Sequence, residues 1–204
     1  MIKTVYFDLG NVLIFFSVPK MLDQISRCTG LPLDQIQKLL IHTELRELYE
    51  KGLIDTEYVY NAFQQVAPKP FSIAQFTHAF SDIFTPNTEL WPIIEQLKKR
   101  GVRLILLSNT SECHFHFASA SYPILKSFDH AVLSYKLGVW KPDHRIFQNA
   151  MAHSECAPHE CFYTDDIPEF IDSARKVGLQ GEIFTDVPRL KQHLIERGCP
   201  LSGG

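Results

Sequence analysis

Polar side chains that could carry out chemistry follow three apolar runs of the sequence. Asp8 follows TVYF, Ser108 and Asn109 follow LILL, and Asp165 and Asp166 follow CFYT. If these runs are parallel strands, their carboxyl ends meet at one edge of a sheet, where active sites form. Each residue alone is also typical of a turn or a helix cap, but their joint placement favours a functional site.

Three of these side chains are carboxylates, and their charges would repel one another at close range. A divalent cation with oxygen ligands would relieve this repulsion, and Mg²⁺ is typically bound by one or two carboxylates together with water and substrate phosphate. Lys141 precedes Pro142, which could open a helix. A lysine is electrostatically disfavoured at a helix N-terminus, so Lys141 indicates a neighbouring carboxylate or anion. The residues therefore predict Mg²⁺ and phosphate chemistry.

The elements that must position these residues are predicted from hydrophobic patterning. Apolar runs typical of buried strands are separated by helical patterns from residue 87 onward, which predicts an α/β fold with a Rossmann-like, doubly wound parallel sheet. The predicted strands are residues 4–9, 103–109, 130–135, 161–166 and 182–186.

A helical insertion separates the first predicted strand from the rest of the sheet. Between residues 17 and 85 no run is typical of a strand, and turn signals divide the segment into amphipathic helices. We expect helices at residues 19–28, 33–50, 56–66 and 72–83. The domain prediction is therefore a core of residues 1–16 and 86–204 and a helical cap of residues 17–85.

Bulk composition narrows the possible partners. The 204 residues carry a formal net charge of −3, which gives no bulk attraction to nucleic acid or to anionic membranes. No run is long and apolar enough for a membrane span, and the first residues lack a signal-peptide cleavage pattern. Five scattered cysteines without a CxxC pair indicate reduced thiols, so we expect a cytoplasmic protein. The sequence does not indicate whether it is a monomer or a homodimer.

At these motifs the sequence resembles the haloacid dehalogenase-like hydrolases. YFDLGNVL is similar to the first motif of that family, LLSNT to the second, Lys141-Pro142 to the third and FYTDD to the fourth. The resemblance covers essentially the whole chain, including a cap after the first motif. The combination of DLGNV, SNT and a following histidine resembles bacterial sugar-phosphate phosphatases, and His114 stands at that following position.

The resemblance implies a Mg²⁺-dependent phosphatase that acts on a small phosphorylated metabolite through an aspartyl-phosphate. It implies catalytic roles for Asp8 as nucleophile and for Lys141. The same comparison implies that the cation is held by Asp8, the Gly10 carbonyl and Asp166, with Asp165 beside them. Substrate-binding residues are then expected to be Ser108, Asn109, Lys141 and His114.

One position departs from the usual phosphatase pattern. Most phosphatases of this kind have a second aspartate two residues after the nucleophile, where it protonates the leaving group, but this chain has Gly10. Two alternatives therefore stay open: a metal-free dehalogenase, in which the aspartate attacks carbon, and a phosphate- or ligand-binding module without catalysis. The acidic pair at 165 and 166 fits the dehalogenase poorly, because unneutralised acids would repel an anionic substrate.

Overall fold

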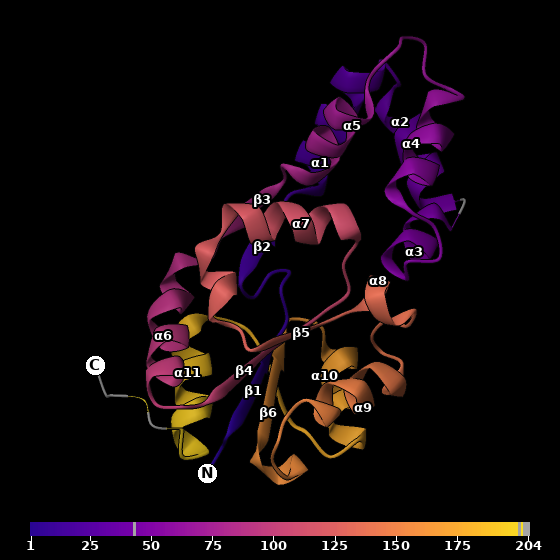
Figure 1. Cartoon of the computed structure of the whole chain (residues 1–204). Coiled ribbons are helices and arrows are strands. Elements are labelled where there is room, and N and C mark those ends of the chain that lie inside the picture. Colours follow the sequence, from indigo (N-terminus) through magenta and orange to yellow (C-terminus); the bar gives the residue numbers. More distant parts are fainter. Residues whose placement is uncertain (43, 200, 202–204) are drawn as a thin grey trace.

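A computed structural model describes residues 1–42, 44–199 and 201 of the chain. Its centre is a five-stranded sheet in the order β5-β4-β1-β6-β7, and every neighbouring pair is parallel. The chain thus forms the expected α/β fold, with a helical insertion after the first strand (Figure 1). The strands of this sheet are β1 (Thr4–Phe7), β4 (Arg103–Ser108), β5 (His130–Leu133), β6 (Cys161–Asp165) and β7 (Gln180–Ile183).

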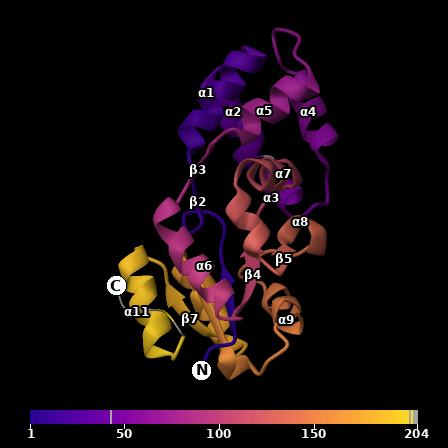
Figure 2. The same ribbon diagram turned by 60° about the vertical axis from the view of Figure 1, so that its left-hand side comes forward.

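Helices cover both faces of the sheet because strand side chains alternate between them. Val5 and Phe7 of β1 pack on one face with apolar residues of α6 and α11, whereas Tyr6 packs on the other face with α9 and α10. Figure 2 shows α6 and α11 on the opposite side of the sheet from α9. The core helices are α6 (Trp91–Lys99), α7 (Glu112–Ser121), α8 (Ser134–Leu137), α9 (His144–Ala152), α10 (Pro168–Lys176) and α11 (Val187–Glu196), with short 3₁₀ turns at Thr88–Leu90, Pro123–Ser127 and Pro158–Glu160.

The inserted helices have a hydrophobic core of their own. It combines aliphatic and aromatic side chains, and the rings of Phe63, Phe76 and Phe80 follow one another with centroids 5.0 and 5.7 Å apart. The cap boundaries at residues 17 and 85 stay a prediction, and this second core is their structural support. The helices are α1 (Val18–Thr29), α2 (Leu33–Gln37), a π-helical turn (Lys38–His42), α3 (Leu45–Glu50), α4 (Thr56–Gln64) and α5 (Ile73–Ser81).

The two chain crossings between core and insertion are paired, which the sequence did not predict. Strand β2 (Ile14–Phe16) and strand β3 (Phe84–Pro86) form an antiparallel ribbon, with Phe16 opposite Phe84. Beside this ribbon, the Asn87 side chain donates a hydrogen bond to the Val12 carbonyl at 2.8 Å. The pairing satisfies backbone groups that would otherwise be free in two connecting segments.

A second contact joins the insertion to the core through α3 and α8, which lie next to each other in Figure 1. The Ser134 hydroxyl donates a hydrogen bond to the Glu50 carbonyl at 2.6 Å. The Lys51 ammonium lies 4.9 Å from the centroid of the Trp140 ring. Gly52 packs so closely that a Cβ atom there would lie 1.9 Å from the Tyr135 carbonyl oxygen. The end of α3 is therefore held against the loop that carries Lys141.

Several expected elements differ in extent. The predicted helix 33–50 is divided into α2, a π-helical turn and α3, and residue 43 lies outside the described residues. The predicted strand 130–135 ends at Leu133 and continues as α8. Strand 182–186 is shifted toward the N-terminus, to 180–183. No helix among the described residues is long and apolar enough to cross a membrane.

The close approach of Gly52 generates a prediction. Gly52→Ala should destabilise the protein more than Gly101→Ala, because both glycines follow a helix at positive φ, +65° and +76°, but no atom lies within 4 Å of a Cβ at Gly101. The shared left-handed conformation costs about 1–2 kcal/mol for a residue with a Cβ. Thermal denaturation of both variants measures the difference, and equal losses would show that the Tyr135 contact contributes nothing.

Candidate active site

Asp8 lies directly after β1, in a turn that is built by backbone hydrogen bonds. The Leu13 and Ile14 amides both donate to the Leu9 carbonyl at 3.0 Å, which folds residues 9–14 into a compact loop. Within this loop Asn11 has φ = +56°, a conformation that asparagine tolerates better than most residues. Its side-chain amide donates a hydrogen bond to Asp166 Oδ2 at 3.0 Å. The turn thus links the ends of β1 and β6.

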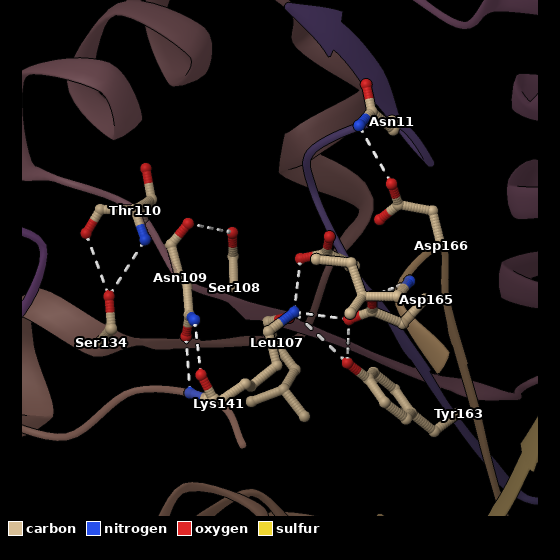
Figure 3. Close-up of polar contacts among 12 residues, drawn as sticks. Asn11, Leu107, Ser108, Asn109, Thr110, Ser134, Lys141, Tyr163, Asp165 and Asp166 are labelled. Atoms are coloured by element: carbon tan, nitrogen blue, oxygen red, sulfur yellow. Dashed lines mark hydrogen bonds and ion pairs between the residues drawn. The ribbon is translucent and has the colours of Figure 1, made fainter. Parts of the chain in front are cut away.

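Lys141 is the centre of the polar network at the carboxyl edge of the sheet (Figure 3). Its ammonium, on a side chain 1% exposed, lies 2.8 Å from Asp8 Oδ1 and 2.6 Å from Asp165 Oδ2. The same nitrogen lies 3.2 Å from both the Leu107 carbonyl and the Tyr163 hydroxyl. A buried lysine with this number of acceptors is a fixed positive charge beside Asp8.

Asn109 holds the backbone of Lys141 from the end of β4. Its side-chain oxygen accepts a hydrogen bond from the Lys141 amide at 2.7 Å, and its side-chain nitrogen donates to the Lys141 carbonyl at 2.9 Å. Figure 3 shows this reciprocal pair. Asn109 was expected to bind substrate. In the structure its side-chain amide is engaged by the Lys141 backbone while the residue still lines the cavity, and its role in substrate binding stays a prediction.

Asp165 faces inward and Asp166 faces the cavity. Both oxygens of Asp165 are occupied, since Oδ1 accepts from the Ile167 amide at 2.9 Å and Oδ2 accepts from Lys141 and from the Tyr163 hydroxyl. Asp165 is fully buried, whereas Asp166 is partly exposed and lines the cavity. Sequence reasoning placed both near the cation, and the contacts distinguish an inner carboxylate from an outer one.

Burial and charge together set the protonation of this cluster. Burial raises the pKa of Asp8 to about 7, although the charge of Lys141 opposes the effect. Burial disfavours the ammonium of Lys141, but Asp165 and Asp8 outweigh it and raise the pKa of that group. Burial, and next the charge of Asp165, hold the pKa of Tyr163 well above its ordinary value, so its hydroxyl stays protonated. Burial and Lys141 thus act in opposite directions on the ionisation of Asp8.

The donor set fits a divalent cation. Asp8, Asp165 and Asp166 each offer a carboxylate oxygen, and these three atoms lie within 4.8 Å of one another. Three carboxylates and the single ammonium of Lys141 leave two negative charges when all are ionised. Oxygen ligands with a charge of −2 match Mg²⁺. Since Asp165 is already engaged, Asp8 and Asp166 are the side chains with oxygens left for a cation.

A cavity of about 340 Å³ opens above these residues. Of the predicted site residues it is lined by Asp8, Gly10, Asn109, Lys141 and Asp166. Trp140 and Pro142, which flank Lys141 in the sequence, also line it. Further lining residues that were not predicted as site residues are Asn11, Phe16, Arg46, Glu50, Ile167 and Phe170. Arg46 and Glu50 come from α3 of the insertion. Only the three-dimensional contact between α3 and the core brings them here, and no local sequence signal marks them.

Two predicted substrate-binding residues do not line the cavity. Ser108 is 1% exposed, and its hydroxyl lies 3.3 Å from the Asn109 carbonyl. The His114 ring stacks on Phe80 at a centroid distance of 4.8 Å, and its Nε2 lies 3.0 Å from the Phe80 carbonyl. Burial lowers the pKa of His114 to about 4. His114 thus packs against Phe80 of α5 and is not among the residues that line the cavity, so its substrate-binding role stays a prediction.

Comparison of the sequence with known protein families identifies the family of this chain. Residues 2–178 match the family model of the haloacid dehalogenase-like hydrolases. The chain belongs to this family. It is thus a hydrolase, with the α/β core and helical insertion described above.

Two relatives with nearly the same sequence identity to this chain are phosphatases named for different substrates. Over 185 residues the chain is 24% identical to sesquiterpene phosphatase from Aspergillus oryzae, covering 90% of each chain. Over 187 residues it is 23% identical to D-ribitol-5-phosphate phosphatase from Bacteroides thetaiotaomicron, covering 88% of this chain and 90% of that one. In two longer relatives the match spans only 15% and 38% of the protein.

A solved structure shares the fold closely. It is a crystal structure of a family enzyme from Bacteroides thetaiotaomicron in complex with magnesium and inorganic phosphate. The TM-score is 0.83 at 22% identity, over 93% of this chain and 99% of that one. At this identity the likeness establishes the shared fold.

The buried ammonium of Lys141 generates the next prediction. In the presence of a chelator, Lys141→Met should lower the free energy of unfolding by about 3–5 kcal/mol at pH 8, because Asp8 and Asp165 lose their common counter-charge. The loss should shrink toward pH 5. The folded-state pKa of Asp8 is raised above its unfolded value, to about 7, so protonated Asp8 needs no counter-charge at pH 5, whereas ionised Asp8 needs Lys141 at pH 8. The stability that Asp8 contributes is accordingly present at low pH and is lost as the pH rises toward 7.

Urea denaturation at the two pH values measures this effect, with Lys99→Met as control because Lys99 is exposed on α6. A pH-independent loss, or a loss no larger than that of the control, would contradict an ion-pair role for Lys141.

Proposed function

We propose that this chain is a Mg²⁺-dependent phosphatase that hydrolyses a small phosphorylated metabolite through an aspartyl-phosphate on Asp8. The observation that carries the proposal is the pairing of Asp8 with the fully buried ammonium of Lys141 on the floor of a cavity. The ion pair favours the ionised form of Asp8, which is the nucleophilic form. It also fixes one carboxylate oxygen, so that the other oxygen is available for attack.

The residues around Asp8 divide the work of binding and charge stabilisation. Lys141 supplies positive charge to phosphate oxygens next to the nucleophile. Asp8, the Gly10 carbonyl and Asp166 would hold Mg²⁺, which when bound neutralises charge on the phosphate oxygens. Asp165 and Asn109 orient Lys141, and Asn11 orients Asp166. In this arrangement the side chains around Asp8 bind the phosphate group and hold Lys141 and Asp166 in position beside the nucleophile.

The size and lining of the cavity indicate which kind of phosphorylated substrate it can hold. A cavity of about 340 Å³ lies at the small end of the range for ligand pockets, which suits a metabolite better than a macromolecule. Phe16, Trp140 and Phe170 give it aromatic walls. The resemblance of DLGNV and SNT to sugar-phosphate phosphatases favours a sugar or sugar-alcohol phosphate, and the related ribitol-phosphate and sesquiterpene phosphatases define the two substrate types to compare.

The two rival functions explain the contacts less well. A metal-free dehalogenase has no use for Asp166, whose charge faces the same cavity as the nucleophile. A binding module without catalysis has no need to bury a lysine against Asp8, because an exposed lysine would bind phosphate without the desolvation cost.

Turnover of p-nitrophenyl phosphate tests the nucleophile. Asp8→Asn is nearly isosteric, so the variant should keep its fold and its affinity for inorganic phosphate but lose turnover by several orders of magnitude. Rapid quenching should trap a phosphorylated intermediate in the original protein and none in the variant. Asp172→Asn, an exposed change on α10, is the control. Normal turnover in purified Asp8→Asn protein would rule out the covalent route.

Metal removal gives an independent prediction. Mg²⁺ at 100 times its Kd should stabilise the protein by about 2.7 kcal/mol, because it binds the folded state only. Asp166→Asn should remove this rise in Tm, whereas Asp172→Asn should keep it. Differential scanning fluorimetry with and without a chelator measures both, and activity that persists in chelator would favour the dehalogenase or another metal-free reaction.

A further inference from the structure

Gly10 leaves the proposed reaction without an acid two residues after the nucleophile, and the structure shows what fills that space. A Cβ atom at Gly10 would lie 3.1 Å from Cε1 of Phe16. Gly10 is not among the glycines with positive φ, so its backbone does not require glycine. The position is therefore covered by an aromatic ring from β2, and the proton must come from another residue.

The cavity contains few groups that could exchange a proton with a leaving group. Among the described lining residues the ionisable side chains are Asp8, Arg46, Glu50, Lys141 and Asp166. Asp8 is the proposed nucleophile, and Asp166 would hold the cation. Lys141 is held by two carboxylates, and a guanidinium does not release its proton in proteins. Glu50 is the carboxyl group that remains.

Glu50 lines the same cavity as Asp8 and comes from the insertion. It is the last residue of α3, and its carbonyl accepts the hydrogen bond from Ser134 that joins α3 to the core. Its side chain is 13% exposed, and Oε1 accepts from Arg46 Nε at 2.7 Å. The Arg46 pair orients one carboxyl oxygen, and Oε2 has no hydrogen-bond partner among the described residues. This second oxygen is free to meet a ligand.

We propose that Glu50, supplied by the insertion, is the catalytic acid and base that Gly10 cannot be. The inference rests on the proposed phosphatase function. As Asp8 bonds to phosphorus, the bond from phosphorus to the leaving oxygen breaks, its electron pair stays on that oxygen, and the Glu50 carboxyl gives it a proton. The product alcohol leaves, and Glu50 is a carboxylate.

The second half of the cycle restores both groups. The Glu50 carboxylate takes a proton from water as the water oxygen bonds to phosphorus. The bond from phosphorus to Asp8 breaks, its electron pair returns to the Asp8 carboxylate, and inorganic phosphate leaves. Glu50 is again protonated, so the two half-reactions balance in atoms, protons and charge.

A leaving-group series tests this role with a matched control. Glu50→Gln should lower the rate of phosphoryl transfer from alkyl phosphates by about 10²–10⁴-fold, since an alkoxide needs the proton. With p-nitrophenyl phosphate the same variant should still give a burst of one p-nitrophenolate per enzyme, followed by slow turnover as the aspartyl-phosphate accumulates. Glu47→Gln, on the same helix and 44% exposed beside Lys51, should behave like the original protein.

Rescue separates proton transfer from a structural role. Gly10→Asp should restore alkyl phosphate hydrolysis to Glu50→Gln, and Phe16→Ala can be added to make room for the new side chain. Failure of both rescued forms, or equal rates for Glu50→Gln and Glu47→Gln, would overturn the role of Glu50. Loss of the burst in Asp8→Asn tests the proposed function separately, because the burst depends on Asp8 and not on Glu50.

Discussion

The ion pair between Lys141 and the two buried carboxylates Asp8 and Asp165 is the interaction on which the site depends. Burying any one of these charges alone would be costly, and the three are tolerable together because each is matched by an opposite charge and by hydrogen bonds. The strand order explains why they meet. Strands β4 and β6 flank β1, so the carboxyl ends of β1 and β6 supply the acids, and Asn109 after β4 holds the loop that carries the lysine. The parallel sheet thus places every member of the cluster at one edge.

Much of this arrangement could be predicted from the sequence. Apolar runs that end in polar residues define the strands and the edge where Asp8, Lys141 and Asp166 gather, because the direction of parallel strands determines where their ends lie. What could not be predicted depends on contacts between distant segments. Strand alternation says nothing about β2 and β3, which are short and exist only because the two crossings pair. The inward direction of Asp165 and the reciprocal bonds of Asn109 likewise depend on where Lys141 lies.

His114 and Glu50 show in two different ways why the sequence did not predict every residue of the cavity. His114 stands at a position that motif similarity associates with substrate, yet its helix packs against α5 and buries the ring against Phe80. Glu50 stands in a helix with no motif, yet the contact of α3 with α8 brings it to the cavity. A motif reports local chemistry, whereas these two positions are decided by how the insertion lies on the core. Gly52 makes that placement specific, since any side chain there would meet the Tyr135 backbone.

The antiparallel ribbon of β2 and β3 has a mechanical consequence. Two independent tethers would let the inserted helices slide, twist and tilt, whereas two paired strands form one connection that restricts such displacements. Phe16 is part of that ribbon and also covers Gly10. A displacement of the inserted helices about this ribbon would therefore shift the ring of Phe16 together with Glu50 relative to Asp8. The ribbon thus couples the cover over Gly10 mechanically to the position of the insertion.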